Sequence, residues 1–217
     1  MFRSATPVED TMLKREFNRW GIYESYGKYE IIIKTTENSF SFLSDPHIQE
    51  YKKKINGSQL ESKNKNKFNL MEKTDSKSKV HVCSNKELKE MTIRLQPMHS
   101  GICIGEIKNK KFTPNLNFAE IIVNQNPKLS YPFVILEEKG SQLALYGRDI
   151  MGKSIILCNN IIKENQILLL LNENKEVIGI GKSRYNDKLI TQSNKVTIDN
   201  IQDIGTYYLK NENKSEI

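Results

Sequence analysis

The side chains of this sequence best suited to chemistry are cations gathered in its last third, with one tyrosine among them. They are Arg148, Lys153, Lys182, Arg184, Tyr185, Lys188 and Lys195. Cations neutralise phosphates and planar rings stack on bases, so this combination suits the binding of RNA. We expect Arg148, Lys182, Arg184 and Lys195 to contact phosphates and Tyr185 to stack on a base. The alternative for each residue is a solvated position on the surface.

No catalytic constellation accompanies these cations. Ser100 and Ser154 lack a nearby histidine–acid arrangement, and Cys103 lies in an apolar stretch where a thiol acts as a small hydrophobe. The three histidines are scattered and the three cysteines widely spaced, so the sequence predicts no metal site and no disulfide framework. We therefore expect a binding protein that is not an enzyme and uses no cofactor.

One segment matches a nucleotide-binding motif by its letters. Residues 147–154, GRDIMGKS, fit the pattern G-x-x-x-x-G-K-S of a phosphate-binding loop. Such a loop should follow a buried strand and open a long helix, whereas residues 155–162 read as an apolar strand and a turn. Nucleotide binding is thus an alternative to RNA binding, and the element after Ser154 distinguishes the two.

Composition limits the class of protein. The chain has 217 residues, enough for one large or two small domains, and carries a net charge of +7, which favours polyanionic partners, nucleic acid first and anionic membrane second. The amino-terminal residues lack an apolar signal core, and no window approaches the roughly 18 apolar residues of a membrane span. We expect a monomeric cytoplasmic protein in a reducing compartment, with no membrane association.

The first half predicts a helix, several strands and a polar insertion. Thr6, Pro7 and Glu9 form a helix start with a capping box, and apolar residues follow at helical spacing up to Trp20. Strands are expected over residues 29–34, 39–43 and 102–107. A lysine-rich, low-complexity stretch near residues 56–84 is expected to be a flexible insertion, because its few apolar residues cannot offset the entropy of ordering it.

The second half is dense in short strands. They are expected at residues 133–136, 155–157, 167–171, 177–181, 195–198 and 207–209. The third and fourth of these form a hairpin, in which Gly179 and Gly181 bring backbone close to a neighbour, through packing more readily than through ligand contact. Such spacing is typical of a small barrel or sandwich. A break at residues 124–130 divides the chain into domains of residues 1–128 and 129–217.

The second half resembles a PUA domain. The resemblance lies in residues 145–150 (LYGRDI), 166–171 (QILLLL) and 177–181 (VIGIG). It implies an α+β fold class, in which an N-terminal α/β domain precedes a β-pseudobarrel that binds structured RNA. Residues 99–105 (HSGICIG), 112–118 (FTPNLNF) and 203–207 (DIGTY) are in turn similar to the Nip-seven family of large-subunit ribosome-assembly factors, in its archaeal form. That similarity covers roughly residues 88–212.

The resemblance implies a function, and the sequence departs from the family pattern in one place. It implies that the N-terminal domain contacts other ribosome-assembly proteins, that the PUA domain holds pre-ribosomal RNA, and that the protein has no catalytic activity. Relatives carry a basic cluster before the closing motif, where this chain has Lys195, Asp199 and Gln202. Only Lys195 fits, so either the RNA face differs from that of the relatives or basic groups elsewhere in the chain compensate. An accessory RNA-binding subunit of an RNA-modification enzyme is the alternative.

Overall fold

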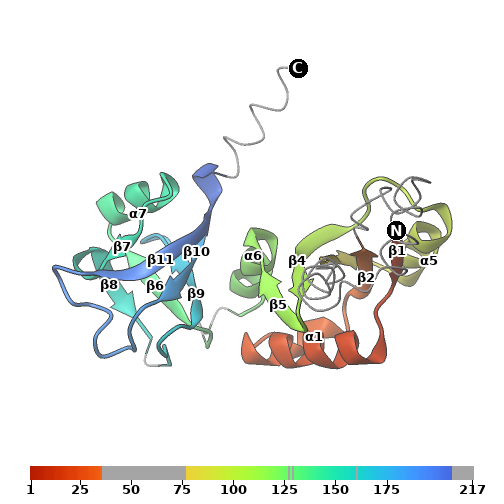
Figure 1. Ribbon diagram of the computed structural model, residues 1–217, viewed down its shortest axis with the longest axis horizontal. Helices are drawn as coiled ribbons and strands as arrows, with labels where there is room; N and C mark the ends of the chain where they lie inside the picture. Colours follow the sequence, from red (N-terminus) through yellow and green to blue (C-terminus); the bar gives the residue numbers. More distant parts are fainter. Residues whose placement is uncertain (36–76, 127, 129, 160, 207–217) are drawn as a thin grey trace, which may run out of the picture.

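Two β-sheets, with helices packed around and between them, make up the fold (Figure 1). The structure is a computed structural model that describes residues 1–35, 77–126, 128, 130–159 and 161–206. The first sheet belongs to an N-terminal α/β unit and the second to a C-terminal, nearly closed β-unit. The predicted α+β fold class is therefore confirmed.

The first sheet has the strand order β1-β2-β3-β4-β5, and all neighbouring strands are antiparallel. Its strands are β1 (Phe2–Ser4), β2 (Glu30–Thr35), β3 (Ser78–Cys83), β4 (Ile102–Lys108) and β5 (Lys111–Pro114). The helices among the described residues of this half are α1 (Pro7–Arg19), α2 (Tyr23–Tyr26), α5 (Lys86–Leu95) and α6 (Leu116–Gln125). The predicted strands at residues 29–34 and 102–107 are thus confirmed as β2 and β4.

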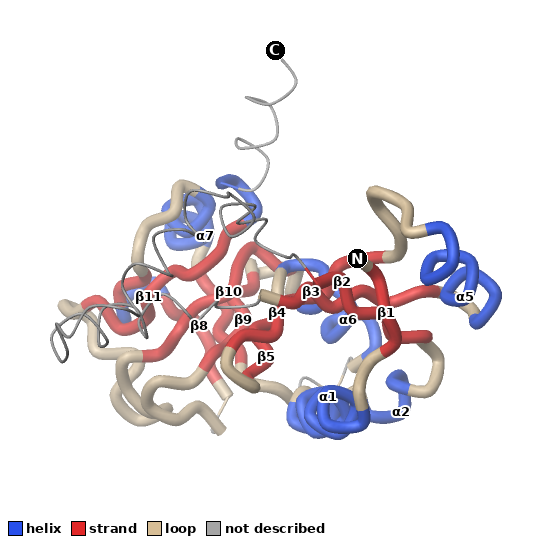
Figure 2. The backbone as a smooth tube through the Cα atoms, turned by 45° about the vertical axis from the view of Figure 1, so that its right-hand side comes forward, coloured by secondary structure: helices blue, strands red, loops and turns tan. Residues whose placement is uncertain are grey.

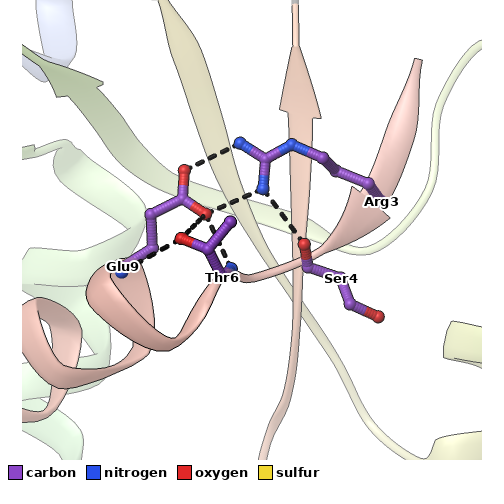
Figure 3. A network of polar contacts seen from close by, with 4 residues as sticks. All are labelled: Arg3, Ser4, Thr6 and Glu9. Atoms are coloured by element: carbon purple, nitrogen blue, oxygen red, sulfur yellow. Dashed lines mark hydrogen bonds and ion pairs between the residues drawn. The ribbon is translucent and has the colours of Figure 1, made fainter.

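The start of α1 is fixed by the predicted capping box. The Glu9 backbone N–H donates to the Thr6 hydroxyl at 3.3 Å, and the Thr6 backbone N–H donates to the Glu9 carboxylate at 2.8 Å. Figure 3 shows that Arg3 joins this network from β1, donating to both Glu9 oxygens at 2.7 Å. The capping residues therefore also anchor the helix to the edge strand of the sheet.

Each face of the first sheet has its own apolar layer. Side chains alternate between the faces of a strand, so Ile31 and Ile33 of β2 join Phe17 of α1 and Phe118 of α6 in the larger core. The rings of Phe17 and Phe118 meet edge to face, with centroids 5.1 Å apart. On the opposite face, α5 contributes Ile93 to a small cluster formed by Phe2, Ile32 and Cys83.

The sequence prediction was wrong at the end of the lysine-rich stretch. Residues 78–83 were assigned to the flexible insertion, but they form β3, which pairs with both β2 and β4. Ser78 and Val80 are buried on either side of the exposed Lys79, and Val82 joins Val80 in the larger core. This alternation was hidden because Lys77 and Lys79 continue the charge pattern of the preceding residues. Residues 56–76 of the predicted insertion lie outside the described residues.

The second sheet has the strand order β7-β11-β10-β9-β6-β8. Its strands are β6 (Phe133–Leu136), β7 (Ile150–Met151), β8 (Ile155–Cys158), β9 (Ile167–Leu171), β10 (Val177–Ser183) and β11 (Val196–Asp203). Helix α7 (Glu138–Leu145) lies between β6 and β7, and only one 3₁₀ turn (Gly152–Ser154) joins β7 to β8. Because β7 and β8 are the two end strands, this short link draws the sheet nearly closed.

The predicted strands of the second half are confirmed wherever the structure describes them, and so is the hairpin of β9 and β10. A Cβ atom on Gly181 would lie 2.5 Å from Ile198 Cγ2, and one on Gly179 would lie 2.8 Å from the Gln202 carbonyl oxygen. Both glycines thus allow β10 to pack closely on β11, as the packing interpretation expects. The strands predicted at residues 39–43 and 207–209 lie outside the described residues.

A single apolar core spans both sheets. It contains Phe118 and Ile122 of α6 together with Leu169 and Leu171 of β9 and Ile180 of β10. Helix α6 packs against β4 on one side and β10 on the other, and Figure 1 shows it between the two sheets. The predicted domain division at residues 128 and 129 stays a prediction, and residues from both sides of it share this core.

Candidate nucleic-acid interface

Three segments that are distant in sequence meet at the β7–β11–β10 side of the second sheet. The Arg184 backbone N–H donates to the Thr197 carbonyl at 2.8 Å, and the Gly152 N–H donates to the Lys195 carbonyl at 3.0 Å. The loop after α7 joins them through the Asn200 N–H, which donates to Asp149 Oδ1 at 3.0 Å. These bonds gather five of the predicted cations, which are Arg148, Lys153, Lys182, Arg184 and Lys195.

The closing motif positions the end of α7. The Asp203 carboxylate accepts hydrogen bonds from the Thr206 N–H at 2.5 Å and the Thr206 hydroxyl at 2.9 Å. Gly205 lies so close to the Leu145 carbonyl oxygen that a Cβ atom would overlap it. The Asn200 amide donates to the Ala144 carbonyl at 2.8 Å. The loop that follows α7 is therefore held against β11.

Arg184 is neutralised by two carboxylates. Its guanidinium contacts Asp199, with Nε donating to Oδ1 at 2.6 Å, and its second branch lies 3.3 Å from Asp149 Oδ2. The hydrogen bond to Asp199 raises the pKa of the Arg184 guanidinium. We call these three residues the Arg184 clamp. Asp199 is one of the two residues that depart from the basic pattern expected from the resemblance, and here its carboxylate pairs with one of the predicted cations.

The other predicted cations are not paired in this way. Arg148, Lys153, Lys188 and Lys195 are exposed, and Lys182 is half-buried in β10, in register with Asp199 on β11. Within the described part of the chain, none of the five forms an ion pair with a carboxylate. Their charges are thus available to a polyanion, whereas that of Arg184 is compensated.

Lys188 lies apart from the others. The structure places it in the loop between β10 and β11, where the neighbouring Asp187 N–H donates to the Ile162 carbonyl at 3.1 Å. No hydrogen bond or ion pair ties Lys188 to the Arg184 clamp within the described residues. The sequence predicted one surface for all seven residues. The hydrogen bonds bring six of them, all except Lys188, to the same side of the second sheet.

The aromatic residues also differ from expectation. Tyr185 is half-buried, and the Lys195 ammonium lies 5.9 Å from the centroid of its ring, so one face of the ring is already covered. Tyr146, which was not predicted as a site residue, is 77% exposed beside Arg148. It ends α7 just before Gly147, whose φ of +72° turns the chain. The sequence signal that could have identified Tyr146 is an aromatic residue directly before a glycine that follows a helix.

The geometry contradicts the nucleotide-binding alternative. Residues 147–154 follow α7 and lead through β7 and a single 3₁₀ turn into β8, so they do not connect a buried strand to a long helix. Gly152 is packed against the backbone of Gln192, where a Cβ atom would overlap the carbonyl oxygen. The backbone of this loop therefore cannot wrap around a triphosphate.

The described residues contain no group of three or more His, Cys, Asp and Glu side chains placed to hold a metal ion. Among them, no helix combines the length and apolar character that crossing a membrane requires.

The second half of the chain matches a known family of domains. Residues 132–213 match the family model described as the UPF0113 PUA domain. A UPF0113 protein of Archaeoglobus fulgidus is 31% identical over 116 residues, which are 52% of this chain and 63% of that relative. The match thus spans less than two thirds of the relative's length.

One solved structure extends the likeness to the whole fold. A hypothetical protein of Pyrococcus horikoshii aligns over 94% of both chains, with a TM-score of 0.54 and 10% identity. A PUA domain structure from Aeropyrum pernix, in complex with tartrate, covers 94% of this chain and 86% of its own, at a TM-score of 0.46 and 9% identity. The Pyrococcus likeness supports the fold alone. Together with the family match, it shows a C-terminal PUA pseudobarrel that follows an N-terminal α/β unit.

Proposed function

We propose that this protein binds structured RNA without catalysing a reaction, using the surface formed by residues 146–153, 182–185 and 195. The observation that carries the proposal is that separate segments bring unpaired cations and an exposed tyrosine to one side of a PUA pseudobarrel. Unpaired cations bind the RNA backbone by releasing counterions, and this sequence-independent contribution supplies much of the affinity.

The residues have different roles at this surface. Arg148, Lys153 and Lys195 are exposed cations that contact phosphates, and Lys182 contributes charge from β10. Tyr146 stacks on an unpaired base, since its ring is more exposed than that of Tyr185. Arg184 holds the surface together through Asp149 and Asp199, and it adds little net charge of its own.

The finer role we propose is that of a large-subunit ribosome-assembly factor in the cytoplasm. Residues 99–105, 112–118 and 203–207 resemble the Nip-seven family, and the last of these segments supports the end of α7 beside the interface. The RNA would then be pre-ribosomal RNA, and the N-terminal unit would contact other assembly proteins. Crosslinking in cells followed by sequencing of the bound RNA tests this role, and recovery of no ribosomal RNA would refute it.

A binding experiment tests the RNA surface. Filter binding of the full chain to structured ribosomal RNA fragments, measured from 50 to 200 mM salt, should show affinity that falls steeply with salt. Arg148→Ala should reduce the slope of log affinity against log salt by about one, and Tyr146→Ala should weaken binding at every salt concentration. Lys111→Ala, an exposed cation of β5 in the other sheet, is the matched control. Equal effects of Arg148→Ala and Lys111→Ala would refute the choice of surface.

A further inference from the structure

A cleft of about 590 Å³ lies where α6 meets the second sheet. Its lining comes from one side of α6, from the turn between β9 and β10, and from the end of α7 with the closing motif after β11. A cleft of this volume accommodates a small organic group such as one base of a nucleic acid. We call it the α6 cleft, and the residues that line it include Glu120, Leu145, Lys175, Glu176 and Ile204.

The floor of the α6 cleft is apolar. Val177 and Ile178, at the start of β10, are only 3% and 6% exposed. Val123 of α6, Leu145 of α7 and Ile204 of the closing motif are half-buried around them. Aliphatic side chains of this kind pack against the face of a base. The floor therefore suits a flat group with apolar faces better than a fully hydrated ion.

Two carboxylates line the cleft above this floor. Glu176 belongs to the β9–β10 turn, where its Oε2 accepts a hydrogen bond from Asn172 Nδ2 at 2.6 Å. Glu120 belongs to α6, and its carboxylate forms no hydrogen bond or ion pair with another described residue. Partial burial and the neighbouring charge of Glu176 raise the pKa of Glu120. Donors from a ligand would stabilise the charged form of this carboxylate.

Lys175 adds a hydrogen-bond donor to the same lining. Its backbone has a φ of +64°, and its N–H donates to the Asn172 carbonyl at 2.9 Å, so the turn that carries it has a defined shape. Its side chain is exposed and, within the described part of the chain, pairs with neither Glu120 nor Glu176. The α6 cleft thus combines acceptors and a donor that do not satisfy one another.

This combination selects among occupants. The two glutamates repel a phosphate, and Lys175 opposes a simple cation. A neutral group that carries both donors and acceptors on one edge satisfies all three side chains, and nucleobases are such groups. Guanine has two adjacent donors, N1–H and N2–H, that match the acceptor oxygens of a carboxylate, and its O6 beside them accepts from an ammonium. The other three RNA bases lack two adjacent donors on this edge.

The α6 cleft adjoins the surface proposed to bind RNA. Leu145 lines the cleft, and Tyr146, the exposed ring of that surface, follows it directly in the chain. The closing motif contacts both, because Ile204 lines the cleft and Gly205 packs on the Leu145 carbonyl. A nucleotide next to one stacked on Tyr146 can therefore reach the cleft.

We propose that the α6 cleft binds an unpaired guanine of the RNA, with Glu120 and Glu176 accepting from N1–H and N2–H and Lys175 donating to O6. The inference rests on the proposed function, and it adds base specificity to cation contacts that carry none. It also gives the N-terminal unit a part in RNA recognition, since Glu120 belongs to α6.

Selection from RNA hairpins with a common stem and a randomised loop tests the inference on the full-length protein. We expect one loop position to be enriched in guanine. In fluorescence anisotropy with a selected hairpin, replacing that guanine with adenine should weaken binding about fivefold to a hundredfold. Inosine lacks only the N2 amino group of guanine, so it should weaken binding less than adenine does.

Variants assign the preference to the cleft. In Glu120→Gln with Glu176→Gln, the guanine and inosine hairpins should bind equally, because the acceptors for N2–H are lost. The matched control is Glu87→Gln with Glu90→Gln, which removes two exposed carboxylates of α5 and should keep the preference for guanine. Figure 1 shows α5 at the opposite end of the molecule from the second sheet, and Figure 2 shows the same separation after a turn of 45°.

The outcomes distinguish this inference from the proposed function. Salt-sensitive binding of hairpins with no enriched guanine would overturn the inference and leave the RNA surface in place, whereas binding of no hairpin at any salt concentration would overturn both. An unchanged preference for guanine over inosine in the Glu120 and Glu176 double variant would also overturn the inference. An arginine-rich peptide that binds the parent protein but not this variant, with loop selection unchanged, would assign the cleft to a basic protein segment instead.

Discussion

Removing the acidic side chains of the Arg184 clamp should increase RNA affinity. In Asp149→Asn with Asp199→Asn, both carboxylates become neutral amides of the same shape, while Oδ1 of residue 149 can still accept the hydrogen bond from the Asn200 N–H. The Arg184 charge is then uncompensated, so the guanidinium can contact a phosphate. The interface gains one cation without any new residue.

The size of the effect follows from counterion release. One added phosphate contact steepens the salt dependence of log affinity by about 0.9 for a duplex or about 0.7 for a single strand. At 0.1 M salt this corresponds to affinity that is about fivefold to eightfold tighter. The midpoint of unfolding should change little, because exposed ion pairs such as these contribute little to stability.

Fluorescence anisotropy with a labelled ribosomal RNA fragment at four salt concentrations measures both the RNA affinity and its salt dependence. The matched control is Glu164→Gln with Asp187→Asn, which removes two negative charges that do not pair with Arg184. A general effect of net charge would change both double variants alike. If the clamp variant has the affinity and salt slope of the parent protein, or matches the control, then Arg184 does not face bound RNA and the reasoning fails.

Three other perturbations test the fold that supports the surfaces. Hydrogen bonds from Arg3 lower the pKa of Glu9 to about 2, so the stabilising contribution of Glu9 is present above the ordinary carboxyl pKa and is lost as the pH falls from about 4.5 toward 2. In urea titrations, Arg3→Ala should therefore lower the free energy of unfolding by about 1 kcal/mol at pH 7 and flatten its dependence on acid pH. Equal pH dependence of the variant and the parent protein would contradict this reasoning. Phe118→Ala, which truncates a fully buried ring in contact with Phe17, should cost about 3–5 kcal/mol in the same titrations. Gly205→Ala forces the closing motif away from the Leu145 carbonyl and should weaken RNA binding through displacement of Tyr146 and Arg148, and unchanged binding would show that the motif does not position them.

Local signals in the sequence were sufficient for much of the fold. The capping box at Thr6 and Glu9 is complete within four residues, so the start of α1 could be predicted. The hairpin of β9 and β10 could be predicted for the same reason, since two apolar runs flank a short polar turn. Strand β3 could not, because its pairing with β2 and β4 is non-local and its lysines resemble those of the preceding segment.

The candidate site could also be predicted only as far as local sequence signals allow. Every cation of the interface could be named from its residue type, but charge compensation depends on distances that the sequence does not contain. Asp149 lies 35 residues from Arg184 in the chain and Asp199 lies 15 residues away, yet both contact its guanidinium. Tyr146 was overlooked because its exposure depends on how α7 ends against β11. Residue type predicted the chemistry, and tertiary contacts decided which residues are free to perform it.

The shared core determines how the two units of the protein can work together. Leu169 and Leu171 of β9 are fully buried in the same cluster as Phe118 and Ile122 of α6. Bending the chain between the two units would expose these side chains, at a cost of roughly 25 cal/mol for each Å² of apolar surface. The N-terminal unit and the proposed RNA surface are therefore held at fixed positions relative to each other. A protein built in this way would orient a bound partner against a bound RNA, whereas flexibly linked domains would only keep the two close together.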